Sequence, residues 1–316
     1  MLQTCMWICI KQKLNNDMPA SCINLPGEFS DILNSKSYVI TLDRNKYRYD
    51  ITSKLLRDAG FTDVVPFQAV DGLAAVDATD EYDARWKSMA TAFHWDLDKC
   101  HLSPGQAGVF MSMIQVWSWI ACSPGPGAMV FEDDALPRPD FGDVFPAYWD
   151  SLGYEGHIDV VYIGAQHHPN HIKNHMSSNG YFTRRPTHCL HAHYMTRIGA
   201  RKILDFLPTL FAWWAAAYKP GRHIPNGEAD GFQHAITDGG IYRDFNEAGI
   251  DEYSYLIPNL SCVAFYGPKI PVKGEFQYET WPERDTGLIH QNASLGSNIG
   301  GLETDWLDGV QNKVVR

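Results

Sequence analysis

The sequence has no long hydrophobic run and fewer basic than acidic residues. No stretch approaches the roughly 18–20 consecutive apolar residues that a membrane-spanning helix needs, so we expect no transmembrane segment. The 26 Lys and Arg residues are outnumbered by 37 Asp and Glu residues, which gives a formal net charge of -11. This balance argues against a protein that coats nucleic acid or an anionic membrane, so we do not expect nucleic acid as a partner.

Paired cysteines are also absent. The seven cysteines are Cys5, Cys9, Cys22, Cys100, Cys122, Cys189 and Cys262. They are odd in number and scattered, without a CxxC pair, which predicts mostly reduced thiols in a reducing compartment. The apolar stretch at residues 6–10 is short for a signal peptide and has no basic residue before it. We therefore expect a cytoplasmic protein.

The remaining composition is that of a globular chain. Of the 316 residues 45% are hydrophobic and 13% aromatic, which is enough for a large core. Internal repeats, heptads and low-complexity tracts are absent. We predict an N-terminal extension over residues 1–36, loosely packed, a main domain over residues 37–300 and a C-terminal tail over residues 301–316.

The pattern of strands and helices predicts an α/β fold with a mostly parallel sheet. A strand at 37–42, a helix at 46–59 ended by Gly60, and a strand at 64–70 form a β-α-β unit. Further strands are predicted at 128–132, 158–164 and 191–195, and further helices at 104–121 and 196–206. From about residue 240 onward we expect an irregular segment packed on this domain.

Three consecutive acids, Glu132, Asp133 and Asp134, end the apolar strand at 128–131. In open α/β sheets, ligands bind at the carboxyl ends of the strands. Because residues i and i+2 of a strand share a face, Glu132 and Asp134 can point at one ligand while Asp133 turns away. Clustered carboxylate oxygens suit Mg, Mn or Ca, and such cations commonly hold phosphates. The alternative is a solvated acidic turn.

Histidines gather between residues 167 and 193. They are His167, His168, His171, His175, His188, His191 and His193. His171 and His175 have the spacing of a zinc pair on a helix, but Pro169 and nearby Asn and Ser residues favour a loop on the acceptor side.

Several segments, in this order, resemble glycosyltransferase family 25, which contains lipopolysaccharide and collagen hydroxylysine galactosyltransferases. The clearest matches are Val39-Ile40-Thr41-Leu42-Asp43-Arg44, Ala69-Val70-Asp71-Gly72, Leu102-Ser103-Pro104-Gly105-Gln106-Ala107-Gly108 and Val130-Phe131-Glu132-Asp133-Asp134-Ala135. The chain departs at Thr41, Met113 and Asn298, where the family usually has Asn, His and Asp. The resemblance implies a GT-A fold, in which a Rossmann-like sheet binds a nucleotide sugar and a carboxylate motif holds a metal.

The resemblance also implies roles for individual residues. Thr41, Leu42 and Arg44 would line the nucleotide pocket, and Asp71 would contact the base or ribose. Ordinary turn and cap chemistry is the alternative for Arg44 and Asp71.

The acidic turn would be the family's DxD-type motif. Asp134 would bind Mn or Mg, with Glu132 or Asp133 on the metal or the ribose hydroxyls. His290 would complete the metal or diphosphate site. The metal would neutralise the leaving diphosphate.

Inversion at the sugar carbon requires a general base that takes the proton from the acceptor hydroxyl. Asp230 is the first candidate and Glu228 the second. The alternative is that these acids occupy a helix N-terminus, where negative charge is favoured.

The sequence therefore predicts a metal-dependent glycosyltransferase that moves galactose or glucose from a UDP-sugar to a hydroxyl, with inversion. The acceptor would be a glycan, a lipid-linked molecule or a protein hydroxyl. Two alternatives stay open: a catalytically inactive family member that binds a glycan or a partner, and a metal-dependent phosphoester hydrolase.

Overall fold

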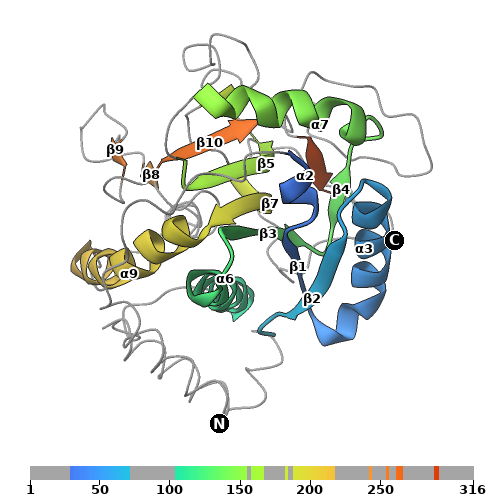
Figure 1. Cartoon of the computed structure of the whole chain (residues 1–316). Coiled ribbons are helices and arrows are strands. Elements are labelled where there is room, and N and C mark those ends of the chain that lie inside the picture. The colour runs from blue at the N-terminus through green and yellow to red at the C-terminus, as the bar shows by residue number, and fades with distance from the viewer. Residues whose placement is uncertain are drawn as a thin grey trace, which may run out of the picture.

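A mixed β-sheet runs through the centre of the molecule. The computed structural model describes residues 29–71, 104–154, 158–166, 182–183, 188–217, 242–243, 254–255, 261–265 and 288–291 (Figure 1). Within these residues a seven-stranded sheet has the strand order β2-β1-β3-β7-β5-β10-β6. Its members are β1 (Lys36–Thr41), β2 (Asp63–Gln68), β3 (Gly127–Glu132), β5 (Val160–Gln166), β6 (Phe182–Thr183), β7 (His188–Thr196) and β10 (Cys262–Phe265).

Most strands of this sheet run in one direction. β1 pairs in parallel with β2 and with β3. β7 is antiparallel to both β3 and β5, so β3 and β5 share a direction. β10 is parallel to β5, and β6 is antiparallel to β10. The carboxyl ends of β1, β2, β3, β5 and β10 therefore lie along one edge, and the amino end of β7 meets them there.

Helices cover both faces of the sheet. Helices α6 (Pro104–Cys122) and α9 (Arg197–Ala217) pack on one face, and α2 (Phe29–Leu33), α3 (Lys46–Asp58) and α7 (Phe141–Asp150) pack on the other (Figure 1). Strand β3 shows the alternation behind this layering. Ala128 and Val130 join the α6/α9 cluster, while Met129 and Phe131 join the opposite one.

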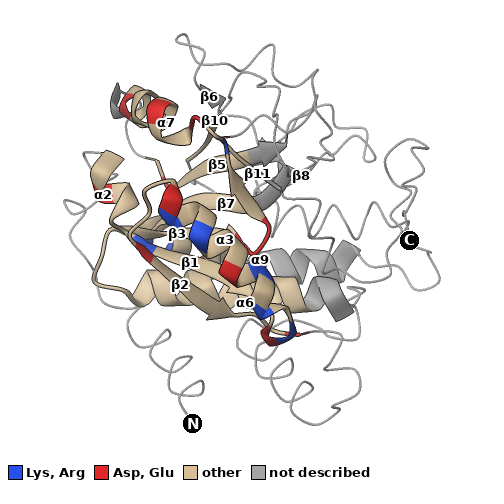
Figure 2. Cartoon of the chain, turned by 90° about the vertical axis from the view of Figure 1, so that its right-hand side faces the viewer, with Lys and Arg blue, Asp and Glu red and all other residues tan. Residues whose placement is uncertain are grey.

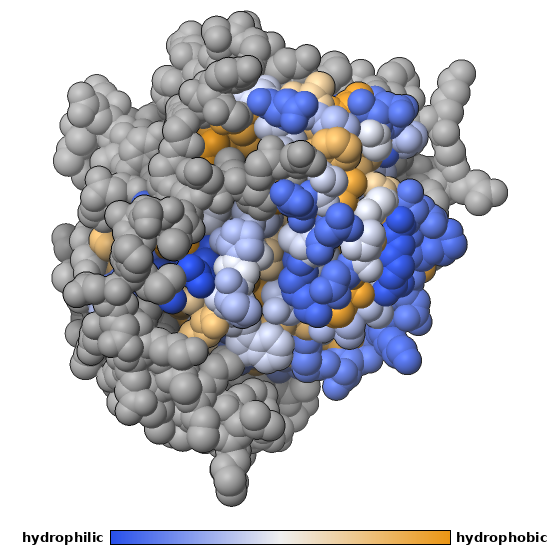
Figure 3. All heavy atoms as spheres, in the orientation of Figure 1, coloured by the Kyte–Doolittle hydropathy of each residue, from blue (hydrophilic) through white to orange (hydrophobic). Residues whose placement is uncertain are grey.

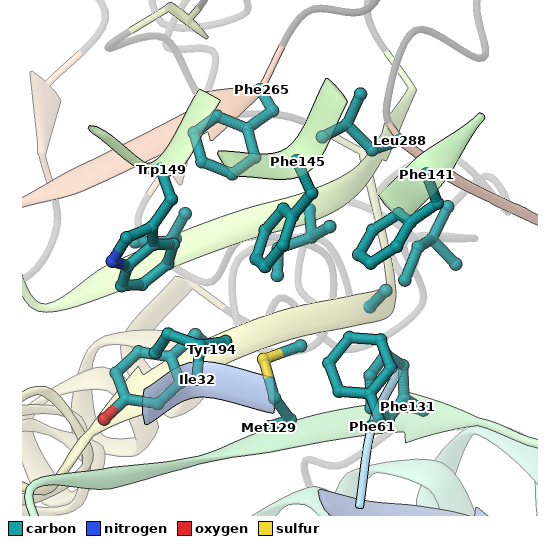
Figure 4. Close-up of a cluster of buried hydrophobic side chains, with 14 of the residues drawn as sticks. Ile32, Phe61, Met129, Phe131, Phe141, Phe145, Trp149, Tyr194, Phe265 and Leu288 are labelled. Atoms are coloured by element: carbon teal, nitrogen blue, oxygen red, sulfur yellow. The ribbon is translucent and has the colours of Figure 1, made fainter. Parts of the chain in front are cut away.

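The cluster beneath α7 is rich in aromatic rings, and Figure 4 shows rings of α7 facing residues of β3 and β7. Phe141 and Phe145 stack with ring centroids 4.7 Å apart. Trp149 meets Tyr194 edge to face at 5.8 Å. Such pairs add to the free energy gained by burying the rings, so they fix α7 firmly on the sheet.

The surface around α3 is strongly polar. Figure 2 shows both basic and acidic residues on this helix, and the same side of the molecule is largely hydrophilic in Figure 3. Lys46, Asp50, Lys54 and Asp58 are all exposed. One charged residue of α3, Arg48, is instead buried, with 2% of its surface exposed.

Short elements lie outside the seven-stranded sheet. The 3-10 helix η1 (Asp43–Asn45) links β1 to α3. β4 (Ala135–Pro137) follows the acidic turn and pairs antiparallel with β11 (Ile289–Gln291). A 3-10 helix, η3 (Ser151–Tyr154), follows α7, and β8 (Tyr242–Arg243) pairs antiparallel with β9 (Ser254–Tyr255).

The predicted α/β fold class with a mostly parallel sheet is confirmed. The expected β-α-β unit is β1-α3-β2, and α3 ends before Gly60, whose φ of 105° lies in the left-handed region that glycine favours. The expected strands at 128–132, 158–164 and 191–195 correspond to β3, β5 and β7.

Three expectations about the extent of elements are wrong. Residues beyond about 240 are not all irregular, because β10 is a buried strand of the central sheet. Helix α9 continues past the predicted end, with Pro208 inside it, to Ala217. The expected loose packing of residues 1–36 is wrong for α2, whose Ile32 lies fully buried in the core.

None of the helices in the described ranges is both long and apolar enough to cross a bilayer.

Candidate functional site

The carboxyl ends of β1, β2 and β3 lie level with one another. Ile40 pairs with Glu132 on one side of β1, and Thr41 pairs with Gln68 on the other. The predicted site residues that follow these strands are therefore brought to one edge of the sheet. Thr41 ends β1 and is followed by Leu42 and Arg44, Asp71 comes after β2, and Glu132 ends β3 and is followed by Asp133 and Asp134.

Asp133 is bound on several sides by the protein itself. Its Oδ2 accepts a hydrogen bond of 2.9 Å from the Thr41 hydroxyl, and its Oδ1 lies 2.8 Å from Arg48 Nε. Its backbone carbonyl accepts a hydrogen bond of 2.7 Å from the Thr52 hydroxyl. Only 3% of Asp133 is exposed. Its carboxylate therefore fixes the turn against β1 and α3, on the side away from solvent.

Arg48, on helix α3, supplies positive charge to the acidic turn. Its Nε contacts Asp133, and its Nη2 lies 3.2 Å from Asp134 Oδ2. Arg48 and Thr52 stand at i and i+4 of α3, so both reach the turn from the same face of the helix. Sequence reasoning missed Arg48. Its signal is slight: a basic residue in the first turn of the helix that follows β1.

Asp134 keeps one oxygen that has no protein partner. Its Oδ2 contacts Arg48, whereas its Oδ1 is buried and accepts no hydrogen bond from the described residues. Burial raises the pKa of the Asp134 carboxyl above its ordinary value, and Arg48 and then His191 oppose that effect. Burial likewise raises the pKa of Asp133, against the influence of Arg48.

The charge of the turn is only partly compensated. The buried carboxylate of Asp133 and the partly exposed one of Asp134 share a single guanidinium, and the half-buried Glu132 precedes them. The turn thus retains negative charge in a region of low dielectric, where a positive ligand is attracted strongly. An oxygen donor set of this kind suits a hard divalent cation.

His191 reaches the same edge from β7. It is fully buried, and its Nε2 lies 2.8 Å from the carbonyl oxygen of Ile289. Its Nδ1 has no hydrogen-bond partner among the described residues. Gly164 gives the ring its place, because a Cβ there would lie 2.2 Å from His191 Nε2 and 2.7 Å from Ile289 O.

The position predicted for His290 is beside the turn. In the antiparallel pair of β11 with β4, His290 is opposite Leu136 and Gln291 is opposite Ala135, the residue after Asp134. The backbone of residue 290 is therefore held next to the acidic turn by two strands far apart in sequence. Its role as a metal ligand stays a prediction.

The other predicted donor residues have partners of their own. Arg44 and Asp71 form an ion pair that joins the ends of β1 and β2. Leu42 is buried, with 8% of its surface exposed. Of the other departures from the family pattern, Met113 is a core residue of α6 with 1% exposed. Asp230, Glu228 and Asn298 lie outside the described residues.

No cluster of three or more His, Cys, Asp or Glu side chains suitable for a metal occurs in the described part of the chain. Two buried atoms at this edge, Asp134 Oδ1 and His191 Nδ1, have no hydrogen-bond partner in the described residues. A cation held jointly with a substrate's phosphates fits this arrangement, because Mg²⁺ sites often use one or two protein ligands plus phosphate oxygens.

The mostly parallel sheet, with an acidic turn at its carboxyl edge, is consistent with a Rossmann-like glycosyltransferase domain. The model of glycosyltransferase family 25 (LPS biosynthesis protein) matches residues 34–210, and the chain belongs to this family. The matched residues include β1, the acidic turn and β7. No curated protein matches the chain. The family resemblance found in the sequence is thus confirmed.

Proposed function

We propose that this glycosyltransferase moves a hexose, galactose or glucose, from a UDP-sugar to an acceptor hydroxyl with inversion, using Mn or Mg. The observation that carries the proposal is the open, buried Oδ1 of Asp134 at the carboxyl edge of a nucleotide-binding type of sheet. Family membership favours this reaction over phosphoester hydrolysis.

Residues around the acidic turn hold the carboxyl edge of the sheet in a conformation that would suit a bound diphosphate. Arg48 and Thr41 hold Asp133, and this fixes the backbone of the turn so that Asp134 stays in one place. Asp134 would hold the cation, with Glu132 beside it and His290 as the predicted third group. When bound there, the cation supplies positive charge to the diphosphate as it leaves.

The nucleotide would lie over the ends of β1 and β2. Thr41, Leu42, Arg44 and Asp71 are the proposed contacts, with the Arg44–Asp71 ion pair bridging the two strand ends. In the transfer, the bond between the anomeric carbon and the diphosphate oxygen breaks while the acceptor oxygen bonds to that carbon. The acceptor proton passes to a carboxylate, for which Asp230 and then Glu228 are the candidates.

The acceptor is proposed from its chemistry and from the family description. A hydroxyl of a lipopolysaccharide core fits the description of the matching family. A hydroxyl of another glycan, of a lipid-linked molecule or of a protein is the wider class. The protein is expected to act in the cytoplasm.

The experiment that tests the proposal is acceptor-free donor hydrolysis. The purified protein is incubated with Mn²⁺ and a panel of UDP- and GDP-sugars, and free nucleoside diphosphate is measured. We expect one UDP-hexose to be hydrolysed by the wild type, and not by Asp134→Asn or after addition of EDTA, while circular dichroism shows that the variant stays folded. If no donor is consumed and no UDP compound shifts the melting temperature with Mn²⁺, the chain is a non-catalytic family member.

A further inference from the structure

The contact of His191 with Ile289 fixes which nitrogen of the imidazole carries the proton. The Ile289 carbonyl can only accept a hydrogen bond, so the Nε2 atom at 2.8 Å must be the donor. In the neutral ring, Nδ1 then carries a lone pair and no proton. This atom is buried and has no partner in the described part of the chain.

The acidic turn lies close to His191. β7 lies beside β3 with Ala192 opposite Phe131, so His191 stands next to the end of β3, from which the turn begins. Asp134 follows Glu132 by two residues, and its carboxyl is close enough to His191 for charges on the two side chains to interact. Two buried atoms without protein partners, one nitrogen and one oxygen, therefore belong to residues at the same edge of the sheet.

Burying such atoms unpaired costs free energy, and proteins retain few of them. Thr41 and Thr52 donate hydrogen bonds to Asp133, and Arg48 contacts Asp133 and Asp134 Oδ2. Asp134 Oδ1 and His191 Nδ1 are two of the few buried side-chain polar atoms of the described residues that have no hydrogen-bond partner. A single ligand that accepts electron pairs from both atoms would satisfy them together.

We propose that His191 Nδ1 and Asp134 Oδ1 bind the same divalent cation, and that the imidazole makes this site prefer Mn²⁺ to Mg²⁺. The inference rests on the proposed function, in which a cation binds at the turn. It adds a ligand from β7, His191, which in the sequence is one of the histidines gathered between residues 167 and 193. Imidazole nitrogen suits first-row transition metals, whereas Mg²⁺ takes oxygen ligands, so this nitrogen discriminates between the two ions.

The geometry around His191 is built to hold the ring in this tautomer. Gly164 sits at a point where the register between β5 and β7 shifts, and any side chain there would collide with the ring and with the Ile289 carbonyl. A ligand imidazole normally donates its second N–H to a carbonyl or carboxylate, which orients it toward the metal. The Ile289 carbonyl does this for His191.

Two amide substitutions separate a structural role from a ligand role. In His191→Gln the amide reaches the place of Nε2, so the bond to Ile289 can be kept while the Nδ1 lone pair is lost. In His191→Asn the shorter amide reaches the place of Nδ1, so an oxygen ligand is kept while the bond to Ile289 is lost. A purely structural histidine would be replaced better by Gln, and a metal ligand better by Asn.

The control is His193→Gln. His193 is a second fully buried histidine of β7, two residues along on the same face, and its ring packs on Tyr162 with centroids 6.1 Å apart. Binding of Mn²⁺ is measured by loss of the free-ion electron paramagnetic resonance signal, with and without UDP. Competition by Mg²⁺ and the melting temperature of each variant are measured in parallel.

We expect His191→Gln to weaken Mn²⁺ binding by at least about tenfold and to lose the preference over Mg²⁺, since even outer-shell changes cost about 10–100-fold. His191→Asn and the His193 control should bind Mn²⁺ within about threefold of wild type, below that range of about 10–100-fold. Wild-type affinity in His191→Gln, or equal loss in all three variants, would overturn the inference.

The outcomes also separate this inference from the proposed function. Wild-type protein that hydrolyses a donor, with unchanged Mn²⁺ binding in His191→Gln, would retain the function and reject the ligand. Wild-type protein that binds Mn²⁺ through His191 but consumes no donor would retain the cation site and reject the reaction.

Discussion

Replacing Arg48 with Met removes the buried cation that holds the acidic turn. Arg48 is 2% exposed, and its guanidinium contacts both Asp133, which is 3% exposed, and Asp134. Removing one partner of a buried ion pair costs about 3–5 kcal/mol, because the remaining charge stays buried without compensation. Here two carboxylates lose their shared partner, so we expect a loss near the upper end of that range.

Urea unfolding followed by tryptophan fluorescence measures the effect at pH 7. By the scaling for domains of 150–250 residues, a loss of 3–5 kcal/mol lowers the melting temperature by roughly 6–20 °C. The matched control is Lys54→Met on the same helix. Lys54 pairs with Asp58, but the two side chains are 74% and 59% exposed. An exposed pair of this kind contributes about 0.3–0.5 kcal/mol.

The pH dependence identifies the cause. Carboxyls that are protonated need no cation, so the difference between Arg48→Met and wild type should shrink as the pH falls from 7 toward 4. If Arg48→Met is as stable as Lys54→Met at pH 7, the ion pairs seen at the turn do not stabilise it, and Asp133 and Asp134 are neutral or solvated in the folded protein.

Three further predictions follow from the same contacts. Gly164→Ala places a Cβ 2.2 Å from the His191 ring, so it should cost about 1–3 kcal/mol in urea unfolding and also weaken Mn²⁺ binding. Lys202→Met removes a 2.8 Å bond to the fully buried Asp159 and should cost about 1.5–3 kcal/mol, while donor hydrolysis stays unchanged because that pair lies at the opposite edge of the sheet. In EDTA, Asp134→Asn should melt higher than wild type at pH 7, and the difference should shrink as the pH falls toward 4.

The sign of the last prediction comes from burial. The folded-state pKa of Asp134 is raised above the ordinary value of 3.8. The stability contributed by this group is therefore fully present below pH 3.8 and is lost as the pH rises through the folded-state pKa. Asparagine carries no such charge. An Asp134→Asn variant that melts lower than wild type at pH 7, or a difference that grows on acidification, would contradict the assignment.

The predictions for Gly164→Ala and Lys202→Met can each be contradicted by one result. If a folded Gly164→Ala protein binds Mn²⁺ as tightly as wild type, His191 is not a ligand of the cation. If Lys202→Met loses donor hydrolysis at a temperature where the variant is fully folded, Lys202 takes part in the reaction and does not only stabilise the fold.

Much of the sheet was predictable because its strands are continuous apolar runs that end in polar residues. β1 and β3 carry that signal clearly, and the acids after β3 mark the ligand edge directly in the sequence. β10 carries little signal, because a four-residue strand more than 90 residues after β5 acquires its partner only in the folded chain.

The contacts inside the site were not predictable for a related reason. Thr41 and Asp133 are 92 residues apart in sequence, and His191 and Ile289 are 98 apart. Nothing local distinguishes Arg48 from the exposed Lys46 two residues before it, since both belong to a charged amphipathic helix. Only the packing of α3 on the turn separates a buried counterion from a solvated charge.

The most direct test of the central claim is anomalous diffraction at the manganese absorption edge, from crystals grown with Mn²⁺ and UDP. The account predicts one anomalous peak at the acidic turn, within about 2.5 Å of Asp134 Oδ1 and bridged to the diphosphate of UDP. UDP bound at another place, or an anomalous peak away from Asp134, would contradict the claim that this turn binds the sugar donor.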